Sequence, residues 1–201
     1  LDAGGEPVGA VLLMFSERHD PPGIRCNIAS WYVDPPYRGY AAMLSAMALK
    51  QKGVIYLNIT PAPNTWPILE AQGYRRYCDG LYLAFPALAR GPKGVSIETV
   101  GPEGGDIAGL GAEEAAILRE LAAQGCVALV ARSAEGAAPF GFLPFRMRSG
   151  RVPLPLMQLV YCRAVEDFVR FAGPLGRALL KRGRLGVFLD ARGPLAGVPG
   201  I

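Results

Sequence analysis

The feature that most constrains the fold of this chain is a weak internal repeat at one spacing, 132 residues. Each match is short, and short apolar strings recur by chance. A single register that runs through strand, loop, helix and strand without a gap is typical of a tandem duplication. The matched segments are Pro7-Val8-Gly9 with Pro139-Phe140-Gly141, Val33-Asp34 with Val165-Glu166, Arg38 with Arg170, and Ile55-Tyr56-Leu57-Asn58 with Val187-Phe188-Leu189-Asp190.

Apolar runs of strand length alternate with segments of helical periodicity in both halves. This pattern predicts an α+β fold of mixed, mostly antiparallel sheets flanked by helices, in two tandem copies. In the first copy we expect strands at 8–15, 26–33, 54–59 and 81–85, and helices at 37–52 and 65–71. In the second we expect strands at 95–100, 127–132, 140–147, 156–162 and 185–190, and helices at 112–124 and within 166–182.

The repeat also predicts the domain organisation: a first copy over 1–86, a linker over 87–94 and a second copy over 95–201. The strand and helix that open the second copy have no counterpart in the first. The segment 66–85 of the first copy has none in the second. Both copies are therefore incomplete in this chain, and we expect the whole protein to be longer at both ends.

Composition excludes several classes of protein. With 51% hydrophobic and 19% charged residues among 201, the chain is neither disordered nor a disulfide-stapled mini-protein. No apolar run is long enough to cross a bilayer, so we expect no membrane partner. Four scattered cysteines and one histidine give no metal-ligand spacing, so we expect no metal site and reduced thiols in a cytoplasmic protein.

The net charge is +4, and basic residues outnumber acidic ones between 132 and 192. A basic half suits a polyanionic partner, or it is an ordinary solvated face. No sequence motif favours nucleic acid, so we keep a basic nucleic-acid-binding protein only as the weakest reading.

The segment WYVDPPYRGYAAML, residues 31–44, carries the clearest chemical signal. A strand ends at two prolines, and a short loop opens a helix, whose N-terminus offers unpaired amides and a positive dipole end. Arg38 adds a cation, and Gly39, Ala41 and Ala42 let an anion approach closely. The arrangement suits a pyrophosphate, although an ordinary turn that caps a buried helix has the same spacing.

This strand, V-D-P-P-Y-R-G and helix resemble the cofactor motif of the GNAT superfamily of acyl-CoA-dependent N-acyltransferases, as does the later E-A-Q-G-Y at 70–74. The resemblance implies acetyl-CoA or another acyl-CoA as cosubstrate and an amine acceptor that the sequence does not identify. In that family the loop cradles the pyrophosphate, and backbone amides at the strand end polarise the thioester. The implied cofactor-binding residues are Val33, Arg38, Gly39, Tyr40, Ala41, Ala42 and Met43.

The chain departs from the family at positions that matter for catalysis. Ala41 and Met43 stand where the family prefers smaller residues, and Met43 would crowd a bound anion. Leu69 occupies the position of a tyrosine that protonates the leaving thiolate, and the strand before the loop has no glutamate for a general base. We therefore assign no catalytic residue.

The second copy of the motif, residues 170–176, keeps Arg170 and a glycine but has Pro174, which lacks an N–H. We expect this copy to serve as scaffold, with a second cofactor site as the alternative, and Pro174 to lie in the first turn of its helix. The functional prediction is an N-acyltransferase. The alternative is a catalytically inert GNAT-like binding or assembly module, and a homo-oligomer stays open.

Overall fold

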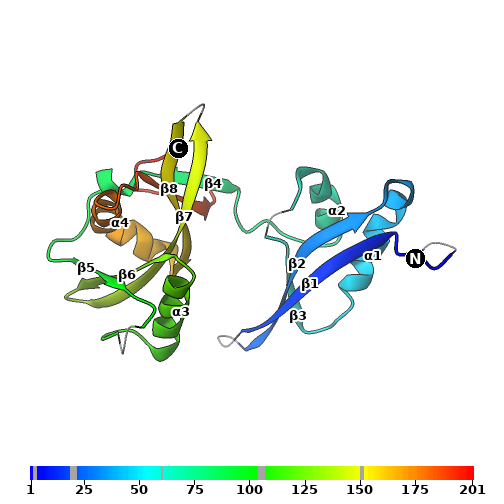
Figure 1. The fold of residues 1–201 in the computed structure, drawn as a ribbon, viewed down its shortest axis with the longest axis horizontal. Coiled ribbons are helices and arrows are strands. Elements are labelled where there is room, and N and C mark those ends of the chain that lie inside the picture. The colour runs from blue at the N-terminus through cyan, green and yellow to red at the C-terminus, as the bar shows by residue number, and fades with distance from the viewer. Residues whose placement is uncertain (2–3, 19–21, 60, 104–106, 150–151) are drawn as a thin grey trace. The chain divides into compact units, whose positions relative to one another are not determined.

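The computed structural model describes all residues except 2–3, 19–21, 60, 104–106 and 150–151. It divides into two compact units, Leu1–Arg75 and Arg76–Ile201 (Figure 1). The division falls before the expected linker, because the segment that follows Arg75 packs with the second unit. The expected ranges 1–86, 87–94 and 95–201 describe copies of a repeat, and as such they stay a prediction.

The first unit is a three-stranded sheet with helices on it, in the order β1-β2-β3 (Figure 1). β1 and β2 pair antiparallel, as expected, and β2 and β3 pair in parallel across a helical connection. Leu44 of α1 lies close to Gly9, since a Cβ atom added there would be 3.4 Å from its side chain, so this helix covers the end of the β1–β2 pair. The elements are β1 Gly9–Arg18, β2 Gly23–Val33, η1 Pro35–Tyr40, α1 Ala41–Ala48, β3 Val54–Leu57, η2 Pro63–Thr65 and α2 Trp66–Ala71.

The prediction of a single helix over 37–52 is wrong in detail. A 3-10 helix, η1, comes first, and the α-helix α1 follows it and ends at Ala48. Pro35 and Pro36 start the 3-10 turn, where their missing N–H groups cost no hydrogen bond. The loop and the helix start are therefore one continuous helical segment.

The second unit holds a six-stranded sheet in the order β4-β9-β8-β7-β6-β5. Among the described strands of this unit, only β8 and β9 pair in parallel, so the expected mixed, mostly antiparallel sheets are confirmed. Phe140, Phe142 and Phe168 are fully buried in the main core, which α4 covers. The elements are β4 Gly80–Ala84, η3 Pro86–Leu88, β5 Ser96–Val100, α3 Ala112–Ala123, β6 Val127–Ser133, β7 Gly136–Ser149, β8 Val152–Cys162, α4 Val165–Leu180 and β9 Gly186–Ala191.

Strand β4 belongs to the second unit, although we expected it to close the first copy. It pairs antiparallel with β9 along its whole length. On its other edge, the Leu83 amide donates to the carbonyl of Ile201 at 2.8 Å, and the Ile201 amide donates back at 3.0 Å. β4 is therefore the edge strand of this sheet, and the C-terminal segment pairs with its outer edge.

Both units contain strand, antiparallel strand, helix and parallel strand in one order. The parallel pairs keep the 132-residue register: Ile24 pairs with Val54, and Leu156 pairs with Gly186. The ungapped register fails in the first strand, because Cys26 pairs with Phe15 whereas Gln158 pairs with Leu143 instead of Met147. The connection between β7 and β8 is shorter than that between β1 and β2. A change in loop length alters the entropy of loop closure only slightly. The duplication itself stays a prediction.

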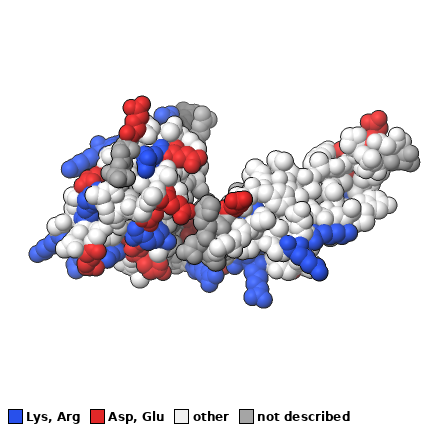
Figure 2. Space-filling model, turned by 90° about the horizontal axis from the view of Figure 1, so that it is seen from below, with Lys and Arg blue, Asp and Glu red and all other residues white. Residues whose placement is uncertain are grey.

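Charges are mixed on the face of the molecule that Figure 2 shows. Basic and acidic side chains alternate over the second unit, and the first unit is mostly uncharged there. Leu12, Met14 and Phe15 of β1 are each about half exposed. No helix in the described ranges is long and apolar enough to cross a membrane.

Candidate functional site

The Arg-Gly loop, residues 33–43, contains all seven expected cofactor-binding residues in one continuous stretch. Val33 is the last residue of β2, the residues 38–40 lie in η1, and 41–43 form the first turn of α1. The side chain of Val33 is buried, whereas Arg38, Gly39, Tyr40, Ala42 and Met43 are exposed. A methyl group added at Gly39 would meet nothing within 4 Å. No described side chain therefore blocks this glycine.

The number of free amides in the loop is smaller than the sequence suggested. The amide of Ala41 donates to the carbonyl of Arg38 within η1, and the amide of Tyr37 donates to Asp34 at 2.8 Å. Pro35 and Pro36 have none to offer. The free cation in this loop is Arg38, which forms no ion pair with any described residue.

Three of the expected residues, Val33, Tyr40 and Met43, also line a cavity of about 460 Å³ in the first unit. The cavity lies between the start of β1 and the helix α1, and none of its lining side chains is charged. Its other lining residues are Leu1, Val8, Gly9, Tyr37, Leu44 and Met47. This side of the loop therefore suits an apolar group, whereas Arg38 suits an anion.

Strand β2 has a free edge where it approaches the loop. Its pairing with β3 ends at Asn27 and Leu57, but β2 continues to Val33. A β-bulge lies in this part of the β1–β2 pair, where the register shifts after Leu12. Along 28–33, backbone groups on the β3 side face no strand in the described structure, so a ligand can pair with them.

The structure explains why no catalytic acid could be assigned. Leu69 is 2% exposed and belongs to the core of the first unit, so its position offers no proton donor. The Tyr74 hydroxyl is buried without a hydrogen-bond partner among the described residues. Burial, with nearby Cys26 and Tyr56, raises the pKa of Tyr74 to about 12, which keeps this phenol protonated at neutral pH.

Residues 170–176, the expected second copy of the motif, lie within the helix α4. Arg170 lies inside α4, forms a 2.6 Å ion pair with Glu135 and stacks on the Phe171 ring at 5.0 Å. Pro174 lies in the interior of the helix, so its expected place in the first turn is wrong. α4 begins right after β8, which moves the motif away from the helix start.

The glycines of this motif allow close packing of another segment of the chain. A Cβ atom on Gly176 would lie 2.1 Å from the Ala87 amide nitrogen, and one on Gly173 would lie 2.5 Å from the Ala89 carbonyl oxygen. The segment 86–90, which overlaps the expected linker 87–94, is thus packed directly on α4. Since their surface is already covered, these glycines cannot serve as an open phosphate site.

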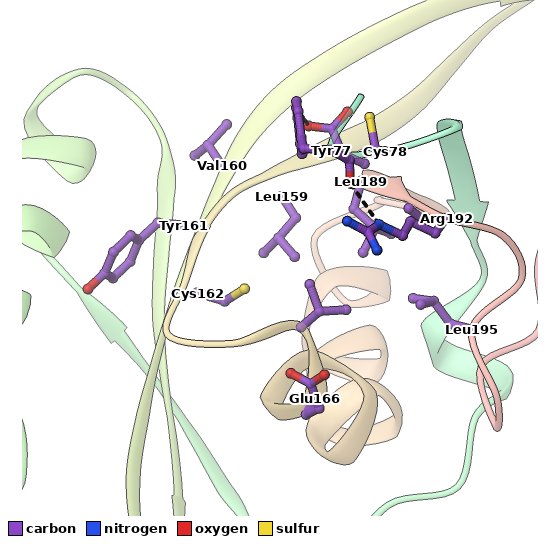
Figure 3. A pocket seen from close by; sticks show the side chains of 13 residues that line it. Tyr77, Cys78, Leu159, Val160, Tyr161, Cys162, Glu166, Leu189, Arg192 and Leu195 are labelled. Atoms are coloured by element: carbon purple, nitrogen blue, oxygen red, sulfur yellow. Dashed lines mark hydrogen bonds between the residues drawn. The ribbon is translucent and has the colours of Figure 1, made fainter. Parts of the chain in front are cut away.

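A second cavity, of about 600 Å³, lies in the second unit where two parallel strands diverge (Figure 3). β8 and β9 pair only up to Gln158 and Phe188, and both then continue without pairing to each other. The start of α4 and the segment before β4 close the remaining sides. The cavity is lined by Tyr77, Cys78, Leu159, Val160, Tyr161, Cys162, Val165, Glu166, Leu189, Asp190, Ala191, Arg192 and Leu195.

Sequence reasoning missed this cavity. Asp190 matched Asn58 in the repeat, but nothing in the sequence indicated that Tyr77 reaches it. In the structure the Tyr77 hydroxyl donates to Asp190 Oδ2 at 2.6 Å, and Arg192 Nε donates to the Tyr77 carbonyl at 3.0 Å. Burial and the Asp190 hydrogen bond raise the pKa of Tyr77, so this phenol stays neutral and holds the carboxylate in place.

The thiol of Cys162 in this cavity should react slowly. Burial, together with Asp167 and Glu166, raises its pKa to about 11 from 9.0. The thiolate fraction near neutral pH is then about a hundredfold below that of an unperturbed thiol. We expect iodoacetamide to label Cys162 in the native protein at least that much more slowly than in the unfolded chain, with a rate that still rises above pH 9. Peptide mass spectrometry measures this, and a rate that levels off below about pH 9 would contradict it.

No protein-family profile matches the chain, and no curated protein matches it in sequence. Solved structures are similar to it in fold. One is described as a GCN5-related glucosamine N-acetyltransferase region in a fungal multi-domain GH3 beta-N-acetylglucosaminidase, with a TM-score of 0.57 over 99% of this chain at 12% identity. The chain has the GNAT fold. Another solved structure, a GCN5-related N-acetyltransferase from Kribbella flavida, is similar at 16% identity over 98% of the chain, with a TM-score of 0.48.

The chain spans 31% of the length of the first of these solved proteins and 54% of the second. At such low identity the likeness shows the fold and leaves the residues of the site to be argued from this chain. In the described ranges, no group of three or more His, Cys, Asp or Glu is placed to hold a metal ion.

Proposed function

We propose that this GNAT-fold protein is an acyl-CoA-dependent N-acyltransferase that binds acetyl-CoA or another acyl-CoA at the Arg-Gly loop. One observation carries the proposal: the free edge of β2 runs directly into an exposed loop with an unpaired arginine. A thioester beside the free edge and a pyrophosphate beside Arg38 would fit one extended ligand. Backbone donors at a strand edge and a cation at its end suit the two polar parts of coenzyme A.

The reaction follows from this placement. The amine nitrogen attacks the thioester carbonyl carbon, the C–N bond forms, the C–S bond breaks, and the amine proton passes through water to the thiolate. Amides on the free edge of β2 stabilise the oxyanion, and the loop holds the cosubstrate in register. No side chain is assigned as acid or base, so positioning supplies most of the rate.

The comparison of Arg38→Ala with Arg170→Ala tests the site. Loss of an arginine that contacts phosphate costs about 1.5–3 kcal/mol, so we expect Arg38→Ala to bind coenzyme A about tenfold to hundredfold more weakly in calorimetry. Arg170 already pairs with Glu135, so Arg170→Ala should leave affinity nearly unchanged. Circular dichroism controls for folding. Equal losses of affinity would indicate two working sites. A larger loss for Arg170→Ala would show that coenzyme A binds in the second unit and not at the Arg-Gly loop.

The second candidate function is an inert GNAT-fold binding module. The buried Leu69 and the occupied amide of Ala41 favour it. Turnover separates the two: thiol release from acetyl-CoA with a panel of amines indicates an enzyme. Glucosamine belongs in that panel, since it is named for the fungal protein of similar fold. Coenzyme A binding without thiol release for any amine would favour the module.

A further inference from the structure

We propose that the cavity of the second unit is a binding site for a small zwitterion with an apolar side chain, an α-amino acid or a dipeptide. This inference goes beyond the proposed function and does not require acyl transfer. It rests on a cavity of about 600 Å³, a size typical of small-molecule sites, and on the charges around it. Figure 3 shows the lining of the cavity.

The cavity has an apolar wall, formed by β8, β9 and the segment after β9. Leu159, Leu189 and Leu195 contribute aliphatic side chains, and Val160 and Val165 extend the wall toward the start of α4. Such a surface is stabilised by an apolar side chain that excludes water from it. A ligand without an apolar part would leave this apolar wall in contact with water.

Three charged groups line the same cavity without neutralising one another. Glu166, Asp190 and Arg192 form no ion pairs, all three being described residues. Tyr77 holds one oxygen of Asp190 through its hydroxyl and Nε of Arg192 through its carbonyl. Asp190 Oδ1 and both Nη atoms of Arg192 make no hydrogen bond with any described residue and can bind a ligand.

These free groups match the two ends of a zwitterion. The Nη atoms of Arg192 can grip a carboxylate in the two-point geometry that guanidinium prefers. The carboxylates of Asp190 and Glu166 can accept hydrogen bonds from an ammonium group. A pyrophosphate fits poorly, because Glu166 and Asp167 place negative charge in the first turn of α4.

Calorimetry on the whole chain tests the proposal with leucine and leucyl-leucine as probes. Three analogues each lack one feature: leucinamide lacks the carboxylate, 4-methylpentanoate lacks the amine, and glycine lacks the side chain. We expect at least one zwitterion to bind saturably and each analogue of it to bind about tenfold to hundredfold more weakly, the scale of a lost charged hydrogen bond. No saturable binding of either zwitterion up to about 10 mM would overturn the proposal.

Substitutions in the cavity test which side chain binds which part of the ligand. Arg192→Gln should weaken leucine binding about tenfold or more and leave leucinamide binding unchanged. Asp190→Asn combined with Glu166→Gln should weaken both. Arg177→Gln and Glu120→Gln are matched controls, since both residues are exposed in the same unit and line neither cavity. Leucine affinity that survives both cavity variants would overturn the assignment.

The test separates this site from the Arg-Gly loop. Arg192→Gln should not change coenzyme A affinity, and Arg38→Ala should not change leucine affinity. Competition between leucine and acetyl-CoA would indicate that the cavity takes part of the acyl-CoA and would overturn the proposal. Failure of coenzyme A to bind would count against the proposed function and leave the zwitterion result standing.

Discussion

A fragment of residues 95–201, the expected second copy, will fail to fold on its own, whereas 76–201 will fold cooperatively. The shorter fragment loses β4, in which Tyr82, Leu83 and Ala84 are 6%, 7% and 0% exposed. Burial of each large side chain contributes about 2–5 kcal/mol, and a whole domain is stable by only about 5–15 kcal/mol. It also uncovers the surface of α4 on which the segment 86–90 lies.

Thermal unfolding followed by circular dichroism, with amide NMR dispersion, checks this result. The fragment 76–201 is the matched control, because it keeps the complete six-stranded sheet. A cooperative transition of 95–201 within about 5 °C of the control would show that β4 is dispensable.

The second large effect is expected at Gly176. In an open helix interior, glycine to alanine adds about 1 kcal/mol of stability. Here the new methyl group would lie 2.1 Å from the backbone nitrogen of Ala87, and backbone cannot rotate away as a side chain can. We expect Gly176→Ala to lower the free energy of unfolding by about 1–3 kcal/mol or more.

Urea denaturation measures the change at Gly176, and Gly101→Ala serves as control because its new Cβ would meet nothing within 4 Å. The sign of the change in the free energy of unfolding decides the outcome. A stabilised Gly176→Ala variant would mean that the segment 86–90 does not pack on α4 in solution.

The sequence allowed the local elements to be predicted, because hydrophobic periodicity acts over a few residues. The antiparallel β1–β2 pair and the helix α3 followed from apolar runs, and α3 carries Glu113 and Glu114 in its first turn as the helix dipole favours. The GNAT fold was implied by the resemblance of the strand, the V-D-P-P-Y-R-G segment and the helix to the cofactor motif of that superfamily.

Contacts between segments far apart in the chain were not predictable. Residues 170–176 were expected to be scaffold, but no local pattern indicated that the segment 86–90 packs on Gly173 and Gly176, where a side chain would not fit. The zwitterion cavity needs Tyr77 beside Asp190, a contact across more than a hundred positions that no local pattern encodes. Ala41 was expected to offer a free amide, and only the 3-10 geometry of η1 shows that the amide is used.

The place of β4 in the second unit has a consequence for how the gene can be rearranged. The codons for residues 76–84 follow those of the first unit, yet they encode an edge strand of the sheet of the second. A genetic crossover between codons 86 and 94 would separate that strand from its neighbours and produce two products with unpaired strand edges. Exchange of the second unit between genes therefore succeeds only when the breakpoint lies before codon 76.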